Sequence, residues 1–164
     1  MNENTQSITI VLYEPEIPPN TGNLIRLSAN AGVQLHLVEP LGFSMDTKAL
    51  RRAGLDYQET ARVTCHPDLA HCFDMLQVED TGRRVFAVST RGSVGYCEPT
   101  YQRGDIFLFG PETRGLPTSV LDDARVHATV KIPMKPDSRS LNLSNAAAII
   151  TFEALRQIGF PDLS

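Results

Sequence analysis

Apolar runs rich in β-branched residues recur along this chain, and between them stand segments whose apolar positions repeat at helical spacing. The runs predict strands at 8–13, 34–38, 61–65, 84–88, 105–109 and 128–132. The intervening segments predict helices at 20–31, 48–53, 68–78, 117–124 and 143–158. Because strands and helices alternate, the pattern favours an α/β fold in which helices flank both faces of a mostly parallel sheet.

The first predicted helix opens at residues 18–20, with Asn20 as its expected N-cap, and Gly32 ends it. Asn23 and Arg26 lie three residues apart and therefore share one face of its early turns. Free backbone N–H groups and the positive end of the helix dipole favour anions there, which suits a phosphodiester. The alternative is that the asparagines cap the helix and Arg26 makes a surface ion pair.

The size of the chain indicates one domain. Its 164 residues, 41% of them hydrophobic, are enough for one substantial core, so we expect residues 1–164 to form a single domain. The first residues lack the basic start and apolar stretch of a signal peptide, and no apolar run is long enough to span a bilayer. We therefore expect a cytoplasmic protein with no membrane partner. Three cysteines fit no disulfide framework and are expected to be reduced.

Charge narrows the range of partners. Fifteen Lys and Arg against nineteen Asp and Glu give a net charge of −4, which argues against a protein that binds nucleic acid through bulk positive potential. A local site is still compatible with this balance, because several arginines cluster and the planar guanidinium group suits phosphate. Most of these arginines can equally be solvated surface charges.

Several catalytic motifs are missing from the sequence. The segment 110–117 lacks the Gly-Lys-Ser/Thr ending of a triphosphate-binding loop, and no Gly-x-Gly-x-x-Gly follows the first strand. No Gly-x-Ser-x-Gly elbow supports a serine hydrolase. The pairs Cys65-His66 and His71-Cys72 lack the usual spacing of a zinc site, so we expect a core cysteine, a surface histidine and no metal.

Two loops near the C-terminus, residues 109–117 and 132–145, each follow a predicted strand and are rich in Gly, Pro or polar side chains. The carboxyl ends of parallel strands meet at one edge of a sheet. Both loops are therefore expected to wall one ligand pocket.

Individual polar residues in these loops allow more than one role. Glu112 either faces a cationic ligand, caps a helix or pairs with Arg114. Asn142 or Ser144 is expected to cap the last helix.

Three ordered motifs, at 19–26, 110–117 and 133–145, carry a resemblance to a known family. The resemblance runs from IVLYEPEIPPNTGN at 10–23 through RRAGLDY at 51–57 to the final helix. With these motifs the sequence resembles the SPOUT superfamily of RNA methyltransferases over nearly its whole length. It is especially similar to the small single-domain tRNA 2'-O-methyltransferases that act on the wobble cytidine or uridine.

The resemblance implies a SPOUT fold, an α/β fold whose C-terminal segments thread through a loop to form a deep trefoil knot. It also implies S-adenosylmethionine as methyl donor, bound in a bent form against the knotted loops. The binding residues would be Val88, Gly110, Glu112, Ile132, Met134, Ser140, Leu141 and Asn145. Gly110 suits this role, since a residue without Cβ lets the adenosine approach the main chain.

The resemblance further implies a homodimer in which the partner subunit completes each active site and the tRNA anticodon stem-loop lies across both subunits. Arg26 would be the central catalytic residue, with Asn23 beside it. A guanidinium group holds its proton far above neutral pH, so Arg26 is expected to anchor a phosphate and stabilise the developing alkoxide rather than act as a base. The expected RNA contacts are Lys48, Arg51, Arg52, Arg91 and Arg114.

Other functions stay open on the sequence. One is a 2'-O-methyltransferase for another tRNA site or for ribosomal RNA. A base-methylating enzyme of the same superfamily is another. A non-catalytic RNA-binding dimer or a cofactor-binding regulator with this fold would not transfer a methyl group at all.

Overall fold

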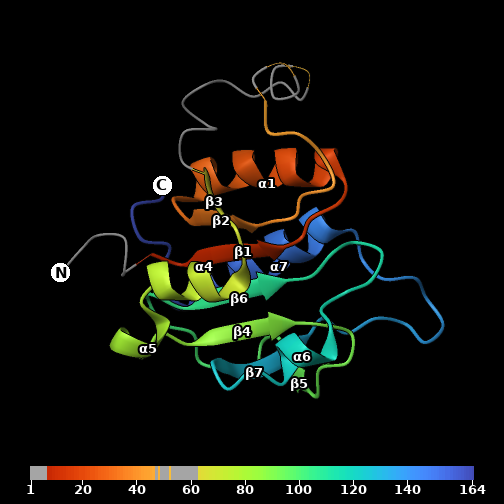
Figure 1. Cartoon of the computed structure of the whole chain (residues 1–164). Helices are drawn as coiled ribbons and strands as arrows, with labels where there is room; N and C mark the ends of the chain where they lie inside the picture. Colours follow the sequence, from red (N-terminus) through yellow and green to blue (C-terminus); the bar gives the residue numbers. More distant parts are fainter. Residues whose placement is uncertain (1–6, 47, 49–51, 53–62) are drawn as a thin grey trace.

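The strands form one parallel sheet. The computed structural model describes residues 7–46, 48, 52 and 63–164, and within them seven strands follow the order β3-β2-β1-β6-β4-β7-β5 with every pairing parallel (Figure 1). The strands are β1 (Thr9–Tyr13), β2 (Gln34–Val38), β3 (Val63–His66), β4 (Val85–Val88), β5 (Val94–Gly95), β6 (Ile106–Phe109) and β7 (Val126–Lys131). Among the described residues, the helices with defined bounds are α1 (Pro18–Ala31), α4 (Leu69–Met75), α5 (Val78–Thr81), α6 (Thr118–Leu121) and α7 (Leu143–Gln157). The expected α/β fold with a mostly parallel sheet is confirmed.

Helices cover both faces of this sheet, because side chains alternate along each strand. Ile10 of β1 and Phe107 of β6 enter a hydrophobic cluster with α1 and α7. Val11 and Leu108, their neighbours in the sequence, enter a second cluster with α4, α5 and α6. The central strands are thus buried on both sides, which accounts for their almost continuous apolar runs.

The start of α1 differs from the expectation. Its N-cap is Ile17, which makes no side-chain capping bond, and two prolines occupy the first helical positions. Proline suits these positions, since a helix leaves its first N–H groups without an internal partner. The prediction that Asn20 caps the helix is therefore wrong, and Asn20 lies buried in the first turn. Gly32 ends α1 with a left-handed φ of 69°, as predicted.

Other boundaries also shift. The helix predicted at 68–78 is divided into α4 and α5, and Asp68 caps α4 by accepting a bond of 2.8 Å from the backbone N–H of His71. The two-residue strand β5, which pairs only with β7 among the described strands, was not predicted. Of the helix predicted at 48–53, residues 48 and 52 are helical and the others lie outside the described residues.

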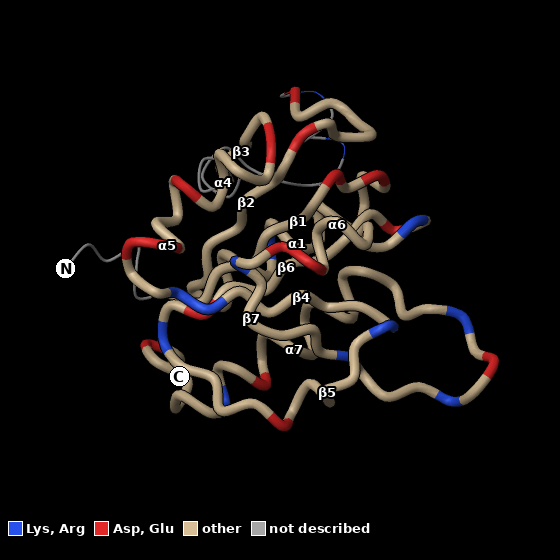
Figure 2. Tube along the Cα trace, turned by 60° about the horizontal axis from the view of Figure 1, so that its bottom comes forward, with Lys and Arg blue, Asp and Glu red and all other residues tan. Residues whose placement is uncertain are grey.

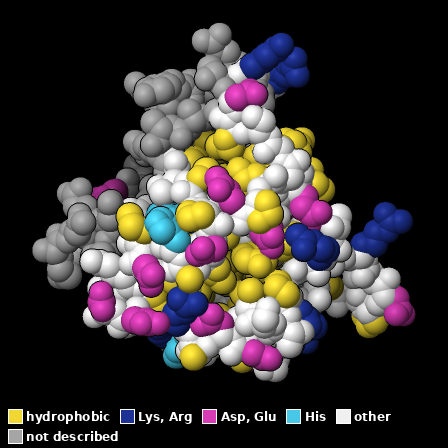
Figure 3. All heavy atoms as spheres, viewed as in Figure 1, with side chains coloured by type: hydrophobic (Ala, Val, Ile, Leu, Met, Phe, Trp, Pro, Cys, Tyr) yellow, Lys and Arg dark blue, Asp and Glu magenta, His cyan; other side chains and the backbone are white. Residues whose placement is uncertain are grey.

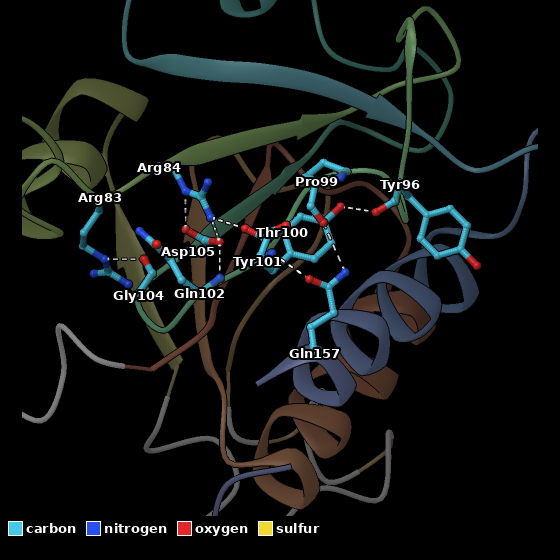
Figure 4. A network of polar contacts seen from close by, with 10 residues as sticks. All are labelled: Arg83, Arg84, Tyr96, Pro99, Thr100, Tyr101, Gln102, Gly104, Asp105 and Gln157. Atoms are coloured by element: carbon cyan, nitrogen blue, oxygen red, sulfur yellow. Dashed lines mark hydrogen bonds and ion pairs between the residues drawn. The ribbon is translucent and has the colours of Figure 1, made fainter. Parts of the chain in front are cut away.

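A polar network fixes the connection between β5 and β6 (Figure 4). Arg84 forms a two-pronged ion pair with buried Asp105, with nitrogen–oxygen distances of 3.0 and 2.7 Å. The side chain of Gln157 accepts a bond of 2.7 Å from the backbone N–H of Tyr101 and donates one of 3.2 Å to the carbonyl of Pro99. These bonds attach the last turn of α7 to a segment far earlier in the chain.

Candidate active site

A cavity of about 400 Å³ lies at the carboxyl ends of β4, β6 and β7. Its walls come from the turn after β4, the loop after β6, the segment between β7 and α7, and the start of α1. Its lining residues are Ile17, Asn20, Val88, Ser89, Thr90, Phe109, Gly110, Pro111, Glu112, Thr113, Arg114, Gly115, Leu116, Ile132, Met134, Ser140, Leu141, Asn142, Leu143 and Ala146. The volume is within the range of small-molecule sites, about 300–1,000 Å³.

The structure brings together seven of the eight residues predicted to bind the methyl donor. Val88, Gly110, Glu112, Ile132, Met134, Ser140 and Leu141 all line this cavity. Asn145 is not among the lining residues; it is exposed in the first turn of α7, and its backbone N–H lies 3.3 Å from the side-chain oxygen of Asn142. Its role in binding stays a prediction.

Sequence reasoning missed other parts of the wall. Ser89 and Thr90 follow β4 directly, so the rule that ligands bind at the carboxyl ends of parallel strands could have found them. Ile17 and Asn20 come from the start of α1, and no local signal in the sequence places them beside two loops about a hundred residues later.

Gly110 is required by the close approach of its own loop. A Cβ added at Gly110 would lie 2.4 Å from the backbone nitrogen of Leu116 and 2.6 Å from the carbonyl carbon of Gly115. Both distances are shorter than any normal contact, so a larger residue must displace the loop. The sequence suggested a different reason, the approach of adenosine. The structure shows that the loop itself already needs glycine at this position.

Glu112 joins the loop after β6 to the start of α1. Its carboxylate accepts hydrogen bonds from the backbone N–H groups of Glu16, at 2.9 Å, and of Ile17, and it lies 3.4 Å from the side-chain nitrogen of Asn20. Of the three roles left open for Glu112, the structure therefore supports helix capping. Arg114 instead lies 4.0 Å from the Glu14 carboxylate.

Glu16 makes the reciprocal contact. Its carboxylate accepts bonds from the backbone N–H of Thr113 at 3.0 Å and from the hydroxyl of Thr113 at 2.8 Å. These two bonds lower the pKa of Glu16. The β1–α1 loop and the β6–α6 loop are thus linked by two carboxylates, one from each loop.

A second link joins α1 to α7. The side-chain oxygen of Asn20 accepts a bond of 2.9 Å from the amide of Asn142. Asn142 also caps α7, because its side-chain oxygen accepts from the backbone N–H of Ser144 at 2.9 Å and from that of Asn145. Of the two candidates for this cap, Asn142 is confirmed.

Arg91, expected to contact RNA, is bonded within the protein. Its guanidinium group donates to the carbonyl of Leu116 and, at 3.1 Å, to the hydroxyl of Thr118. These contacts hold the loop after β6 against the turn after β4. The structure therefore gives Arg91 a local task at the cavity wall that the sequence did not reveal, and its contact with RNA stays a prediction.

The predicted catalytic pair lies outside the cavity wall. Asn23 and Arg26 are both exposed on one face of α1, as the helical spacing predicted. Neither lines the cavity, whereas Asn20 does. Six residues of helix separate Arg26 from Asn20, which corresponds to about 9 Å along the axis.

The other predicted RNA contacts are distributed over the surface. Lys48, Arg52 and Arg114 are exposed, and Arg51 lies outside the described residues. The space-filling view shows cationic groups separated by acidic ones on this face of the molecule (Figure 3). The loop between β7 and α7, which extends from the body, carries exposed Lys135 and Arg139, which were not predicted as contacts (Figure 2).

His36, His66 and Cys72 form a buried cluster beside β2 and β3, whereas Cys65 and His71 of the two pairs are exposed. His36 Nδ1 lies 2.8 Å from His66 Nε2, and His66 Nδ1 lies 3.0 Å from His71 Nδ1. His66 is 1% exposed, so the expectation of a surface histidine is wrong for this residue, whereas Cys72 is the expected core cysteine. Burial, His66 and Arg83 lower the pKa of His36 to about 4, and burial raises the pKa of Cys72 to about 12.

This cluster has the geometry of a hydrogen-bonded chain. His36, His66 and Cys72 place their ligand atoms within 4.8 Å of one another, which would allow a metal on proximity alone. Two nitrogens on one zinc ion would lie about 3.3 Å apart, given Zn–N distances of about 2.0–2.1 Å and tetrahedral geometry. The observed 2.8 Å is shorter. The absence of a metal stays a prediction.

A sequence profile described as the SpoU rRNA Methylase family matches residues 7–152. The chain belongs to this family. The match spans β1 to the middle of α7, and so includes every segment that lines the cavity. The predicted resemblance to RNA methyltransferases is confirmed.

Particular members of the family are close to this chain. The tRNA (cytidine(34)-2'-O)-methyltransferase of Escherichia coli strain K12 is 54% identical over 154 residues, which cover 94% of this chain and 96% of that enzyme. A solved structure described as "Structural insights into the 2-OH methylation of C/U34 on tRNA" is 45% identical with a TM-score of 0.83, and the match covers 94% of this chain and 97% of that one.

A more distant solved structure is an AdoMet-bound rRNA methyltransferase from Sinorhizobium meliloti. It is 26% identical to this chain with a TM-score of 0.78, and the match covers 94% of this chain and 58% of that one. Separately, none of the described helices combines the length and the hydropathy needed to cross a bilayer.

Proposed function

We propose that this protein transfers a methyl group from S-adenosylmethionine to the ribose 2'-hydroxyl of the wobble cytidine or uridine, nucleotide 34, of tRNA. The observation that carries the proposal is the cavity in which seven residues predicted to bind the methyl donor meet. The 54% identity to a tRNA (cytidine(34)-2'-O)-methyltransferase along nearly the whole of both chains supports this substrate and this atom.

The cavity suits S-adenosylmethionine in size and chemistry. Val88, Ile132 and Leu141 offer apolar cover for an adenine ring, and polar groups of the two loops surround them. Leu141 is 40% exposed, so a bound adenosine would cover apolar surface that now faces solvent. When bound, S-adenosylmethionine supplies a methyl group activated on a sulfonium. The AdoMet-bound relative from Sinorhizobium meliloti supports this choice of donor.

The chain's own residues would hold the ribose for attack. Methyl transfer would form a bond from the 2'-oxygen to the methyl carbon as the carbon–sulfur bond breaks, with the neutral thioether S-adenosylhomocysteine as the leaving group and the hydroxyl proton passing to solvent water. Because a guanidinium group donates hydrogen bonds and carries a positive charge, Arg26 would anchor the adjacent phosphate and stabilise charge on the oxygen, with Asn23 beside it. Holding the oxygen in line with the methyl group would supply much of the rate.

A homodimer is part of the proposal. Ile149 and Phe152 are 38% and 42% exposed on the outer face of α7, and a second copy would cover them. A second copy would also bring further residues to each cavity, as the resemblance implies. The two subunits would merge scattered cations, among them Lys48, Arg51, Arg52 and Arg114, into one surface for the anticodon stem-loop. We place this reaction in the cytoplasm.

The trefoil knot implied by the resemblance is also part of the proposal. Its support is the strand order: β6 lies between β1 and β4, and β7 lies between β4 and β5, so the chain returns twice into the sheet it has already built. Tracing residues 84–157 in an experimental structure tests it. An unthreaded path would contradict the knot without affecting the proposed reaction.

The proposed activity can be tested with purified protein, methyl-labelled S-adenosylmethionine and a tRNA that carries C34 or U34. We expect the label in a 2'-O-methylated nucleoside at position 34, identified by mass spectrometry. The matched control is the same tRNA with a 2'-deoxynucleotide at position 34, which should accept no methyl group. Ribosomal RNA serves as a competing substrate.

Each alternative function gives a different result. A 2'-O-methyl group at another tRNA position or in ribosomal RNA would indicate a 2'-O-methyltransferase with a different target nucleotide. A labelled base would indicate a base methyltransferase. Binding of tRNA without any transfer would indicate a non-catalytic RNA-binding protein.

A further inference from the structure

Three segments that are distant in sequence meet at one buried side chain, that of Asn20. The segments are the first turn of α1, the loop after β6 and the N-terminus of α7. Asn20 is 5% exposed, and both ends of its amide are used. The nitrogen faces Glu112 at 3.4 Å, and the oxygen accepts from Asn142 at 2.9 Å.

The orientation of this amide is fixed by its neighbours. Reversing it would place the Asn20 oxygen against the Glu112 carboxylate and its N–H group against that of Asn142. Each contact would then join two acceptors or two donors. A buried polar group without a suitable partner is costly, so the arrangement has one satisfied orientation. Asn20 therefore connects both cavity loops to α1 with a defined geometry.

The position of α1 matters for the reaction because this helix carries Asn23 and Arg26 one and two turns beyond Asn20. We propose that Asn20 and Asn142 are positioning residues for methyl transfer. Through their hydrogen bond, here called the Asn20–Asn142 bridge, they set α1 relative to the cavity and so align the ribose with the methyl donor. This inference rests on the proposed function. A displacement of about 1 Å in such an alignment can cost about a hundredfold in rate.

The bridge can be broken while the cap of α7 is kept. In Asn142→Asp one carboxylate oxygen still accepts from the N–H groups of Ser144 and Asn145, and aspartate is a good N-cap. The other oxygen replaces the amide that donates to Asn20. We expect kcat to fall at least tenfold, with less than threefold change in the dissociation constant of S-adenosylmethionine and a melting temperature close to that of wild type.

Two further variants make the test independent of one substitution. Asn142→Ser also keeps a capping side chain but is too short to reach Asn20. The matched control is Asp68→Asn, which exchanges carboxylate for amide at the N-cap of α4, away from the cavity wall. We expect kcat to fall at least tenfold in Asn142→Ser, as in Asn142→Asp. In Asp68→Asn we expect kcat to equal that of wild type.

A double-mutant cycle separates the bridge from independent effects of each residue. We expect Asn142→Ser to lower kcat tenfold or more in the wild-type background but less than threefold in Asn20→Ala, where the bridge is already absent. Independent roles would instead multiply the two losses. A multiplicative result, or a kcat within twofold of wild type for both Asn142 variants, would overturn the inference.

The outcomes also distinguish this inference from the proposed function. If the wild-type protein methylates position 34 and the Asn142 variants match it, the bridge has no positioning role. If the wild-type protein transfers no methyl group to tRNA, the proposed function fails, and the inference fails with it. If the variants lose S-adenosylmethionine binding to the same extent as kcat, the residues act on the cofactor site and not on alignment.

Discussion

Glu16 and Glu112 each hold the loop that carries the other. The Glu112 carboxylate accepts from the backbone at the start of α1, and the Glu16 carboxylate accepts from the backbone and hydroxyl of Thr113. The loop that precedes α1 and the loop that walls the cavity are therefore expected to move together. A substitution that displaces one loop should also displace the other.

Replacing Glu112 by Gln should weaken binding of S-adenosylmethionine. The substitution Glu112→Gln would keep the size of the side chain but turn one acceptor into a donor that faces backbone N–H groups. Hydrogen bonds to charged groups contribute about 1.5–3 kcal/mol. We therefore expect the dissociation constant of S-adenosylmethionine, measured by calorimetry, to be at least tenfold larger. Glu98→Gln, which alters another carboxylate bonded to a backbone N–H, is the control. Equal affinities for wild type and Glu112→Gln would contradict this role of the loop contact.

Replacing Arg91 by Ala should affect the donor site more than RNA binding. The guanidinium group holds the carbonyl of Leu116 and the hydroxyl of Thr118, so its loss should loosen the cavity wall and weaken S-adenosylmethionine binding several-fold. A residue that contacts one phosphate changes the salt dependence of RNA affinity by about one unit of slope. We expect the full change for Arg114→Ala and a smaller one for Arg91→Ala, whose guanidinium group is already bonded within the protein. A full unit of slope lost in Arg91→Ala, with unchanged affinity for S-adenosylmethionine, would contradict its role at the cavity wall.

Replacing Gly110 by Ala should damage the cavity because the new Cβ meets backbone atoms, which have little room to move. We expect a loss of S-adenosylmethionine affinity of tenfold or more and a lower melting temperature. Gly95→Ala is the matched control, since a Cβ there lies 3.5 Å from the side chain of Glu98, an ordinary contact. If Gly110→Ala bound the donor like wild type, the close approach of Leu116 would not be a constraint.

Replacing Phe152 by Glu should separate the proposed dimer. A carboxylate in the centre of an apolar contact between two copies would have to lose its hydration, so we expect a monomer by sedimentation velocity. Phe160 is also 42% exposed but lies beyond the end of α7, and Phe160→Glu should leave the dimer intact. Were Phe152→Glu to remain dimeric, α7 would not form the interface.

Replacing His36 by Gln should reduce the sensitivity of the protein to acid. The unfolded chain binds a proton at His36 near pH 6.5, whereas the folded protein resists protonation until about pH 4. The contribution of neutral His36 to the free energy of unfolding is therefore fully present above pH 6.5 and is lost as the pH falls from 6.5 to about 4. At pH 5 the loss from this group is about 2 kcal/mol. Urea unfolding at pH 7.5 and pH 5 should show a smaller difference for His36→Gln than for wild type, while exposed His127→Gln should behave like wild type.

Much of the fold could be predicted because buried parallel strands leave a clear pattern. The apolar run at 105–109 and the alternation of strands and helices are sufficient to predict a buried parallel sheet and the α/β class. The two residues of β5 carry no such pattern, since the strand is too short for periodicity. The start of α1 was misplaced because Asn20 is a good capping residue in isolation, and its real partners, Glu112 and Asn142, are distant in the sequence.

The candidate site could be predicted as two loops but not as one network. The rule for strand ends placed residues such as Gly110 and Ile132 at one pocket, and they line it. The contacts that join the loops are side-chain bonds across about a hundred residues, as between Glu16 and Thr113. Neither the composition nor the spacing of residues in the sequence indicates such bonds. For the same reason the sequence predicted an RNA contact for Arg91 but not its bonds to Leu116 and Thr118.

The two neighbours of β1 in the sheet are made at very different times during synthesis of the chain. Thr9 pairs with Gln34 on one side but with Ile106 on the other, so half of the partners of the first strand emerge from the ribosome long after it does. Contacts of such wide separation slow folding, and an incomplete chain would present an open strand edge in the meantime. A nascent copy halted before residue 106 should therefore stay sensitive to protease and depend on chaperones, whereas the finished chain should not.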